Sequence, residues 1–135
     1  SEMCIRDRTT AYWCVLAALI LPYCFTLISK FTGRMPLKAN AGVRDWQDKL
    51  ADGVARRAHW AQLNSFEVTP AFAAAVIIAH QVGTAAQSTI DQLAIAFVIS
   101  RVVFGILYLQ NLPTLRTLVW TLGMALIVSF FVVSA

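Results

Sequence analysis

The chain has 135 residues, of which 59% are apolar and only 13% are charged, and its mean hydropathy is +0.66. This composition excludes an ordinary soluble domain, because a chain of this length can bury only part of its surface, whereas lipid can cover apolar surface that a small core cannot. We therefore predict an all-α integral membrane protein, built as a four-helix bundle.

Four segments are long and apolar enough to cross a bilayer, which takes about 20 residues of helix. Residues 1–8 differ in composition from the rest of the chain and form a candidate non-native leader ahead of a single four-helix domain at residues 9–135. The first predicted span is 11–29, and the second is 68–90, with its entry near Ala61. The third is 92–110 and the fourth is 117–135. Turn residues at 83–91 and 111–113 leave only short connections, so successive helices should be antiparallel.

The distribution of basic residues predicts the orientation of the chain. The first loop contains seven of them, namely Lys30, Arg34, Lys38, Arg44, Lys49, Arg56 and Arg57, and the second loop contains none. Because Lys and Arg near helix ends are retained in the cytoplasm, we place the first and third loops there and both termini on the opposite face. The net charge of +4 lies mostly in the first loop, and its simplest interpretation is attraction to anionic lipid. We predict no nucleic-acid partner.

Cysteine and histidine residues indicate neither a disulfide framework nor a metal site. The chain has three cysteines, and two of them, Cys14 and Cys24, lie within the first predicted span. His59 and His80 have no Cys or paired carboxylate at ligand spacing. We therefore predict no bound metal.

Polar residues within the predicted spans are the candidates for chemistry, since ionisable groups are costly inside a membrane. On the second helix, four residues share one face at spacings of three and four: Arg57, Trp60, Asn64 and Glu67. The third helix has a similar stripe: Arg101, Phe104, Gly105 and Tyr108. If the stripes face each other, Arg101 can neutralise Glu67, while Asn64 and Tyr108 line the same cleft. Arg116 and Thr117 offer a guanidinium and a hydroxyl for an anion at the start of the fourth helix. The alternative is a purely structural pair of Glu67 with Arg101, with Asn64 as an interhelical contact.

Two stretches of the chain resemble one known family. Residues 56–70 read RRAHWAQLNSFEVTP and are followed by AFAAAVIIAH, while residues 101–117 read RVVFGILYLQNLPTLRT. The first resembles the second helix of the MAPEG superfamily, the membrane-associated proteins in eicosanoid and glutathione metabolism. The second resembles that family's third helix and the entry to its fourth. The agreement in length, helix count and motif order extends from about Thr9 to Ala135.

The resemblance implies a left-handed four-helix bundle that assembles as a homotrimer and binds glutathione between neighbouring subunits. The chain is most like the small bacterial members of the family, which implies a multi-pass protein of the bacterial inner membrane. Asn64 and Glu67 match the residues that hold the glutathione backbone, and Tyr108 matches a tyrosine that contacts it. Arg57, a cation at the cytoplasmic end, suits a glutathione carboxylate.

The resemblance also assigns the residues closest to the chemistry. Allowing a one-residue gap, Arg116 matches the arginine that stabilises the glutathione thiolate, and it is the candidate catalytic residue. Thr117 stands where some members carry Ser, and Arg101 matches an arginine of structural character. Two positions depart from the family: Trp60 stands where glutathione-using relatives commonly carry Arg, and Phe104 where they carry Tyr or His.

These features leave two functions open. The first is a glutathione transferase-like enzyme that conjugates or reduces lipophilic electrophiles arriving from the bilayer, with glutathione as co-substrate. The second is a non-catalytic membrane protein of the same fold that binds lipid or a partner subunit. A transporter is disfavoured because the chain has no inverted repeat and few polar faces.

Overall fold

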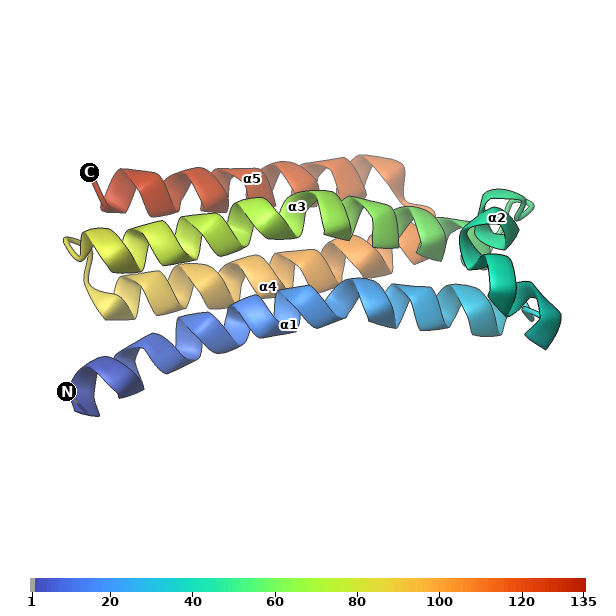
Figure 1. Cartoon of the computed structure of the whole chain (residues 1–135). Helices are drawn as coiled ribbons and strands as arrows, with labels where there is room; N and C mark the ends of the chain where they lie inside the picture. The colour runs from blue at the N-terminus through green and yellow to red at the C-terminus, as the bar shows by residue number, and fades with distance from the viewer. Residues whose placement is uncertain (1) are drawn as a thin grey trace.

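The computed structural model describes the backbone of residues 2–135 and the side chains of residues 10–135. The described backbone is helical, without strands (Figure 1). The elements are α1 (Glu2–Thr32), the 3-10 helix η1 (Leu37–Gly42), α2 (Val43–Asp48), α3 (Val54–Val82), α4 (Gln87–Leu109) and α5 (Pro113–Val133). The Thr10–Thr32 part of α1 and the whole of α3, α4 and α5 are long and apolar enough to cross a membrane. The chain is thus an integral, multi-pass membrane protein, as the composition predicted.

Several helix boundaries differ from the predicted ones. Helix α4 begins at Gln87 rather than at residue 92, so the last five of the predicted turn residues, 87–91, are helical. Helix α3 begins at Val54 rather than near Ala61, and it ends at Val82, well before residue 90. It ends there because Gly83 adopts a left-handed conformation (φ 76°), which glycine tolerates without steric cost. Helix α5 begins at Pro113 rather than at residue 117, with proline in the first turn, where its missing N–H is not needed. Helix α1 begins at Glu2, within the candidate leader, and the side chains of residues 1–9 lie outside the described part of the chain.

The long helices run antiparallel in chain order, as the short connections predicted. Both termini lie at one end of the bundle, and α2 lies at the other (Figure 1). Helices α3 and α4 pack against each other, and each also contacts α1 and α5. The α2 end therefore brings together the start of α3, the end of α4 and the start of α5.

An aromatic core fills the half of the bundle nearer the termini. The rings of Phe72 and Phe97 stack with centroids 4.1 Å apart, and Phe130 meets Phe72 edge-on at 5.9 Å. All three side chains are fully buried. Offset stacks and edge-on contacts are the arrangements that aromatic rings favour, so this cluster fixes how α3, α4 and α5 pack.

A glycine allows the close approach of α1 to α4. A Cβ atom placed on Gly105 would overlap the ring of Phe25, which is itself buried. Gly105, one of the four residues of the stripe predicted on this helix, therefore faces α1.

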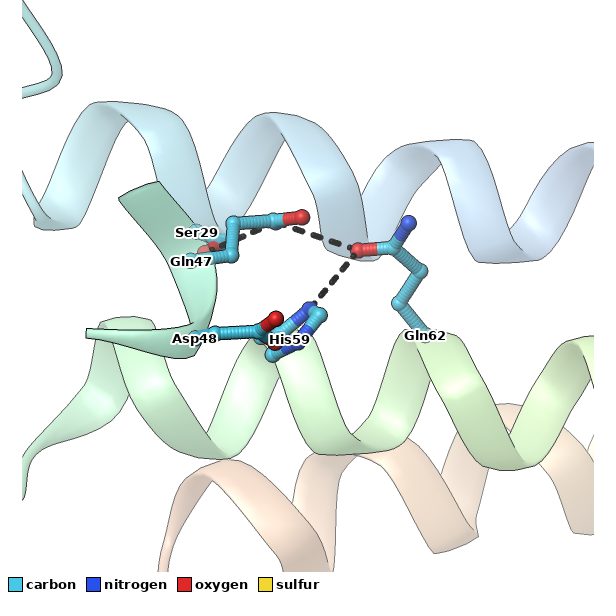
Figure 2. Close-up of polar contacts among 5 residues, drawn as sticks. All are labelled: Ser29, Gln47, Asp48, His59 and Gln62. Atoms are coloured by element: carbon cyan, nitrogen blue, oxygen red, sulfur yellow. Dashed lines mark hydrogen bonds and ion pairs between the residues drawn. The ribbon is translucent and has the colours of Figure 1, made fainter. Parts of the chain in front are cut away.

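Buried polar residues hold α2 against the bundle (Figure 2). Gln47 of α2 donates from Nε2 to Ser29 Oγ of α1 (3.2 Å) and to Gln62 Oε1 of α3 (3.1 Å). His59 Nδ1 lies 3.5 Å from the same Gln62 oxygen, and its Nε2 lies 3.3 Å from Asp48 Oδ1. Buried polar groups stabilise a fold only when they are hydrogen-bonded, and this cluster pairs them across three helices. Part of the first loop is therefore ordered against the membrane domain.

Candidate functional site

A cavity of about 500 Å³ lies between α3, α4 and α5 toward the α2 end of the bundle. It opens at the surface, since several of the residues that line it are exposed. The lining residues are Trp60, Leu63, Asn64 and Glu67 of α3, Phe104 and Tyr108 of α4, and Arg116, Thr117 and Trp120 of α5. Their spacing of three or four residues along each helix places each set on one helical face. Five of the six predicted site residues therefore surround one cavity.

Arg116 and Tyr108 form one wall of this cavity. The Arg116 guanidinium lies over the Tyr108 ring, 4.3 Å from its centroid, at a distance where a cation is attracted to the aromatic face. Phe104 contacts the Tyr108 ring edge-on, with centroids 5.6 Å apart. Arg116 stands in the first turn of α5, where its N–H donates to Leu112 O (3.0 Å). The positive end of the helix dipole therefore adds to the guanidinium charge and favours an anion at this wall.

Arg101 of α4 holds Asn64 of α3 by a hydrogen bond from the buried side of the cavity. Arg101 Nη2 donates to Asn64 Oδ1 at 2.7 Å and lies 3.5 Å from Ser65 Oγ, and its guanidinium stacks over Phe104 at 4.2 Å. Arg101 is only 3% exposed. This contact joins the buried centre of the bundle to the floor of the cavity.

The prediction that Glu67 pairs with Arg101 is wrong within the described part of the single chain. Arg101 contacts Asn64 instead, and Glu67 makes no ion pair within residues 10–135. Glu67 is exposed and lines the cavity. Asn64 and Glu67 lie one helical turn apart on the same face of α3. Asn64 is the more buried of the two, and it is the one that binds Arg101.

The two remaining predicted residues differ in position. Thr117 lines the cavity, and its hydroxyl donates to Pro113 O in its own helix (3.0 Å), so that its oxygen can still accept a hydrogen bond. Arg57 does not line the cavity. It donates from Nε (3.2 Å) and Nη2 (3.1 Å) to Leu109 O at the end of α4, which satisfies a terminal helix carbonyl. Arg57 therefore does not reach the cavity of its own chain.

Two tryptophans at the cavity were not predicted as site residues. Trp60 and Trp120 are 39% and 37% exposed, so each presents an apolar face beside the polar groups. The position of Trp120, four residues after Arg116, is the signal that would have identified it. Among residues 10–135, no group of three or more His, Cys, Asp or Glu side chains is placed to hold a metal ion.

Comparison with models of known families identifies the family of the chain. Residues 10–135, nearly the whole chain, match the model of the MAPEG family. Characterised proteins and solved structures gave no match to the chain. The family match covers all four membrane-crossing helices and every residue that lines the cavity, so the chain belongs to the MAPEG family.

Proposed function

We propose that this protein is a glutathione transferase-like enzyme of the bacterial inner membrane, which uses glutathione to conjugate or reduce lipophilic electrophiles. One observation supports the proposal most directly: Arg116, Tyr108, Asn64 and Glu67 line the same cavity, although they come from three helices. Members of the MAPEG family generally act with glutathione. A cavity of about 500 Å³ is within the range of small-molecule sites.

Arg116 is the residue assigned to the chemistry. The thiolate form of glutathione is the nucleophile, and a free cysteine thiol has a pKa of about 8.5, so near neutral pH most of it is unreactive. A fixed guanidinium beside the sulfur favours the anion and lowers the pKa of the bound thiol. In conjugation, the thiolate sulfur forms a bond to the electrophilic carbon and the leaving group departs with its electron pair. Arg116 acts by stabilising charge and need not transfer a proton.

The remaining lining residues are assigned to binding and orientation. Glu67, with no ion pair among the described residues, suits the ammonium group of glutathione, and Asn64 suits its backbone. Tyr108, whose ring lies under the Arg116 guanidinium, and Thr117, which also lines the cavity, are assigned to contacts with the ligand. Trp60 and Trp120 give the opening of the cavity apolar surface, which suits an electrophile that arrives dissolved in lipid.

The site is proposed to be completed by a neighbouring subunit in a homotrimer. The cavity opens at the surface of the single chain, and the departures at Trp60 and Phe104 remove two polar contacts from it. A second subunit supplies the missing wall and further polar groups. Assembly and ligand binding are then expected to depend on each other.

A non-catalytic role is the second candidate. The observation that favours it is the contact between Arg116 and Tyr108, because an arginine already paired with an aromatic ring can serve packing alone. The two candidates differ in whether Arg116 is available to a ligand, and both its side chain and that of Tyr108 are only half-buried at the cavity.

A ligand titration separates these candidates. Detergent-purified protein is titrated with glutathione while its thermal unfolding is followed, and conjugation is then measured with an aryl halide. The enzyme is expected to show a saturable rise in Tm and a glutathione-dependent product. A protein that shows neither at millimolar glutathione is not a glutathione transferase.

A further inference from the structure

Arg101 is a buried cation without a carboxylate partner. It is 3% exposed, and within residues 10–135 no Asp or Glu oxygen lies within ion-pair distance of it. Its closest contact is the neutral oxygen Asn64 Oδ1, at 2.7 Å, and its Nη1 atom is buried with no hydrogen-bond partner. A carboxylate at position 64 would satisfy this guanidinium better than an amide does, because charge-assisted pairs are shorter and stronger. The amide must therefore serve something other than the pairing of Arg101.

The contact with Arg101 fixes which way the Asn64 amide points. A guanidinium has only donors, whereas an amide has an acceptor oxygen and a donor nitrogen. Only the oxygen can face Arg101, so the two N–H groups of Nδ2 face away from it. Nδ2 makes no hydrogen bond to the described side chains or backbone, and Asn64 lines the cavity. The Asn64 NH₂ group is thus available as a donor to the cavity, whereas a freely rotating asparagine could present either its NH₂ group or its oxygen.

We propose that Arg101 is a positioning residue that sets the hydrogen-bonding polarity of the ligand site, by holding Asn64 so that its NH₂ group faces the cavity. The ligand must then place an acceptor oxygen, a carboxylate or a carbonyl, against Asn64. Glu67, one turn further along the same face of α3, accepts and does not donate when ionised. Along α3 the site therefore presents a donor at Asn64 and an acceptor at Glu67. It selects a ligand that places an oxygen against Asn64 and a cationic or N–H group against Glu67. That the ligand is glutathione rests on the proposed function, whereas the orientation of Asn64 does not.

Asn64→Asp tests the contact between Asn64 and Arg101 without any ligand. The substitution keeps the size of the side chain and gives Arg101 an anion, so the Tm of the unliganded protein should rise or stay unchanged, even though the new carboxylate lies near Glu67. Asn40→Asp is the matched control, because Asn40 is exposed in the first loop. It makes the same chemical change without a buried guanidinium and should leave the Tm unchanged. A clear fall in Tm for Asn64→Asp alone would contradict the contact between Asn64 and Arg101 on which the assigned orientation depends.

The same variant tests the polarity of the site. With Asp at position 64, the cavity receives an oxygen where it had N–H donors, so the Kd for glutathione should weaken by about tenfold or more. A variant that is folded and binds glutathione within about twofold of wild type overturns the proposal. If wild type itself does not bind glutathione, the proposed function fails. The Tm comparison still tests the contact between Asn64 and Arg101 in that case.

Substitutions of Arg101 separate positioning from structural support. Lysine also has only donors, so Arg101→Lys should still hold the oxygen of Asn64 and keep glutathione binding close to that of wild type. Glutamine can accept from the Asn64 NH₂ group as well as donate to its oxygen, so Arg101→Gln should weaken binding more than Arg101→Lys does. Both variants are compared at a temperature where each is folded. Equal binding by the two variants, at any level of stability, contradicts a role in setting polarity.

Discussion

Arg116 combines two features that a thiolate-stabilising residue needs, a charge at a cavity and a fixed position. The Arg116 guanidinium is positioned by its contact with the Tyr108 ring, and the backbone of Arg116 is fixed in the first turn of α5. Arg116→Ala should therefore lower the rate of conjugation by about tenfold or more, and should raise the pH at which the bound thiolate absorbance appears, because the cation favours the ionised sulfur. Arg116→Lys should restore part of both effects, since Lys keeps the charge without the planar fork.

Glu67 is the residue whose surroundings distinguish a ligand group from a structural one. It is exposed and makes no ion pair in the described chain, so Glu67→Gln should leave the Tm of the unliganded protein nearly unchanged. The glutathione-induced rise in Tm should disappear, because the neutral side chain no longer attracts the ammonium group. The measurement is a thermal-shift titration of both proteins. A large loss of stability without ligand would instead indicate that Glu67 pairs with a cation of a neighbouring subunit.

At the scale of the helices, Gly105 is required by the contact between α1 and α4. Any larger residue there overlaps the buried ring of Phe25. Gly105→Ala should therefore destabilise the fold by about 1–3 kcal/mol, the usual range for overpacking. Gly123→Ala in α5 is the matched control, because its added Cβ would make only ordinary contacts, with Ser100 Oγ at 3.5 Å and a Phe97 ring carbon at 3.7 Å. Thermal unfolding in detergent should show a lower Tm for the first variant only.

The sequence predicted the membrane-crossing helices better than their ends. Long apolar runs identified all four, because lipid requires about 20 largely apolar residues in a helix. The start of α3 was missed because Arg56, Arg57 and His59 interrupt the apolar run there, yet the segment remains helical where it packs against the first loop through His59. Turn chemistry was the better guide, since Gly83 and Pro113 mark the true boundaries.

The candidate site was predicted as a set of residues but not as a set of contacts. Helical spacing was enough to place Asn64 and Glu67 on one face of α3. Spacing does not tell which of two residues one turn apart is the deeper, so Arg101 was assigned to Glu67 instead of Asn64. The bond from Arg57 to Leu109 O was also beyond the sequence, because any backbone carbonyl can accept it.

At the scale of the whole molecule, the orientation in the membrane follows from the charges of the α2 end. All seven basic residues of the first loop region and Arg116 lie toward this end, while Gly83–Ala86 at the other end carries none. In a background without native cysteines, Asn40→Cys should be labelled from the cytoplasm by a membrane-impermeant thiol reagent, and Ser88→Cys from the opposite side. Both residues are exposed. Labelling of both from one side would contradict the antiparallel crossing of the membrane.

Assembly is the second property of the whole molecule that the cavity makes testable. The cavity lies between α3, α4 and α5 and opens at the surface, where Trp60 and Trp120 are exposed, so a single chain encloses a ligand incompletely. A neighbouring subunit against this face would cover the opening, and the closed ring that the family resemblance implies is a homotrimer. Native mass spectrometry in mild detergent should show a trimer, and saturating glutathione should shift any monomer toward it, because a ligand that binds only the assembled site stabilises the assembly. If the protein stays monomeric with and without glutathione and the monomer still binds glutathione, the complete site lies within one chain.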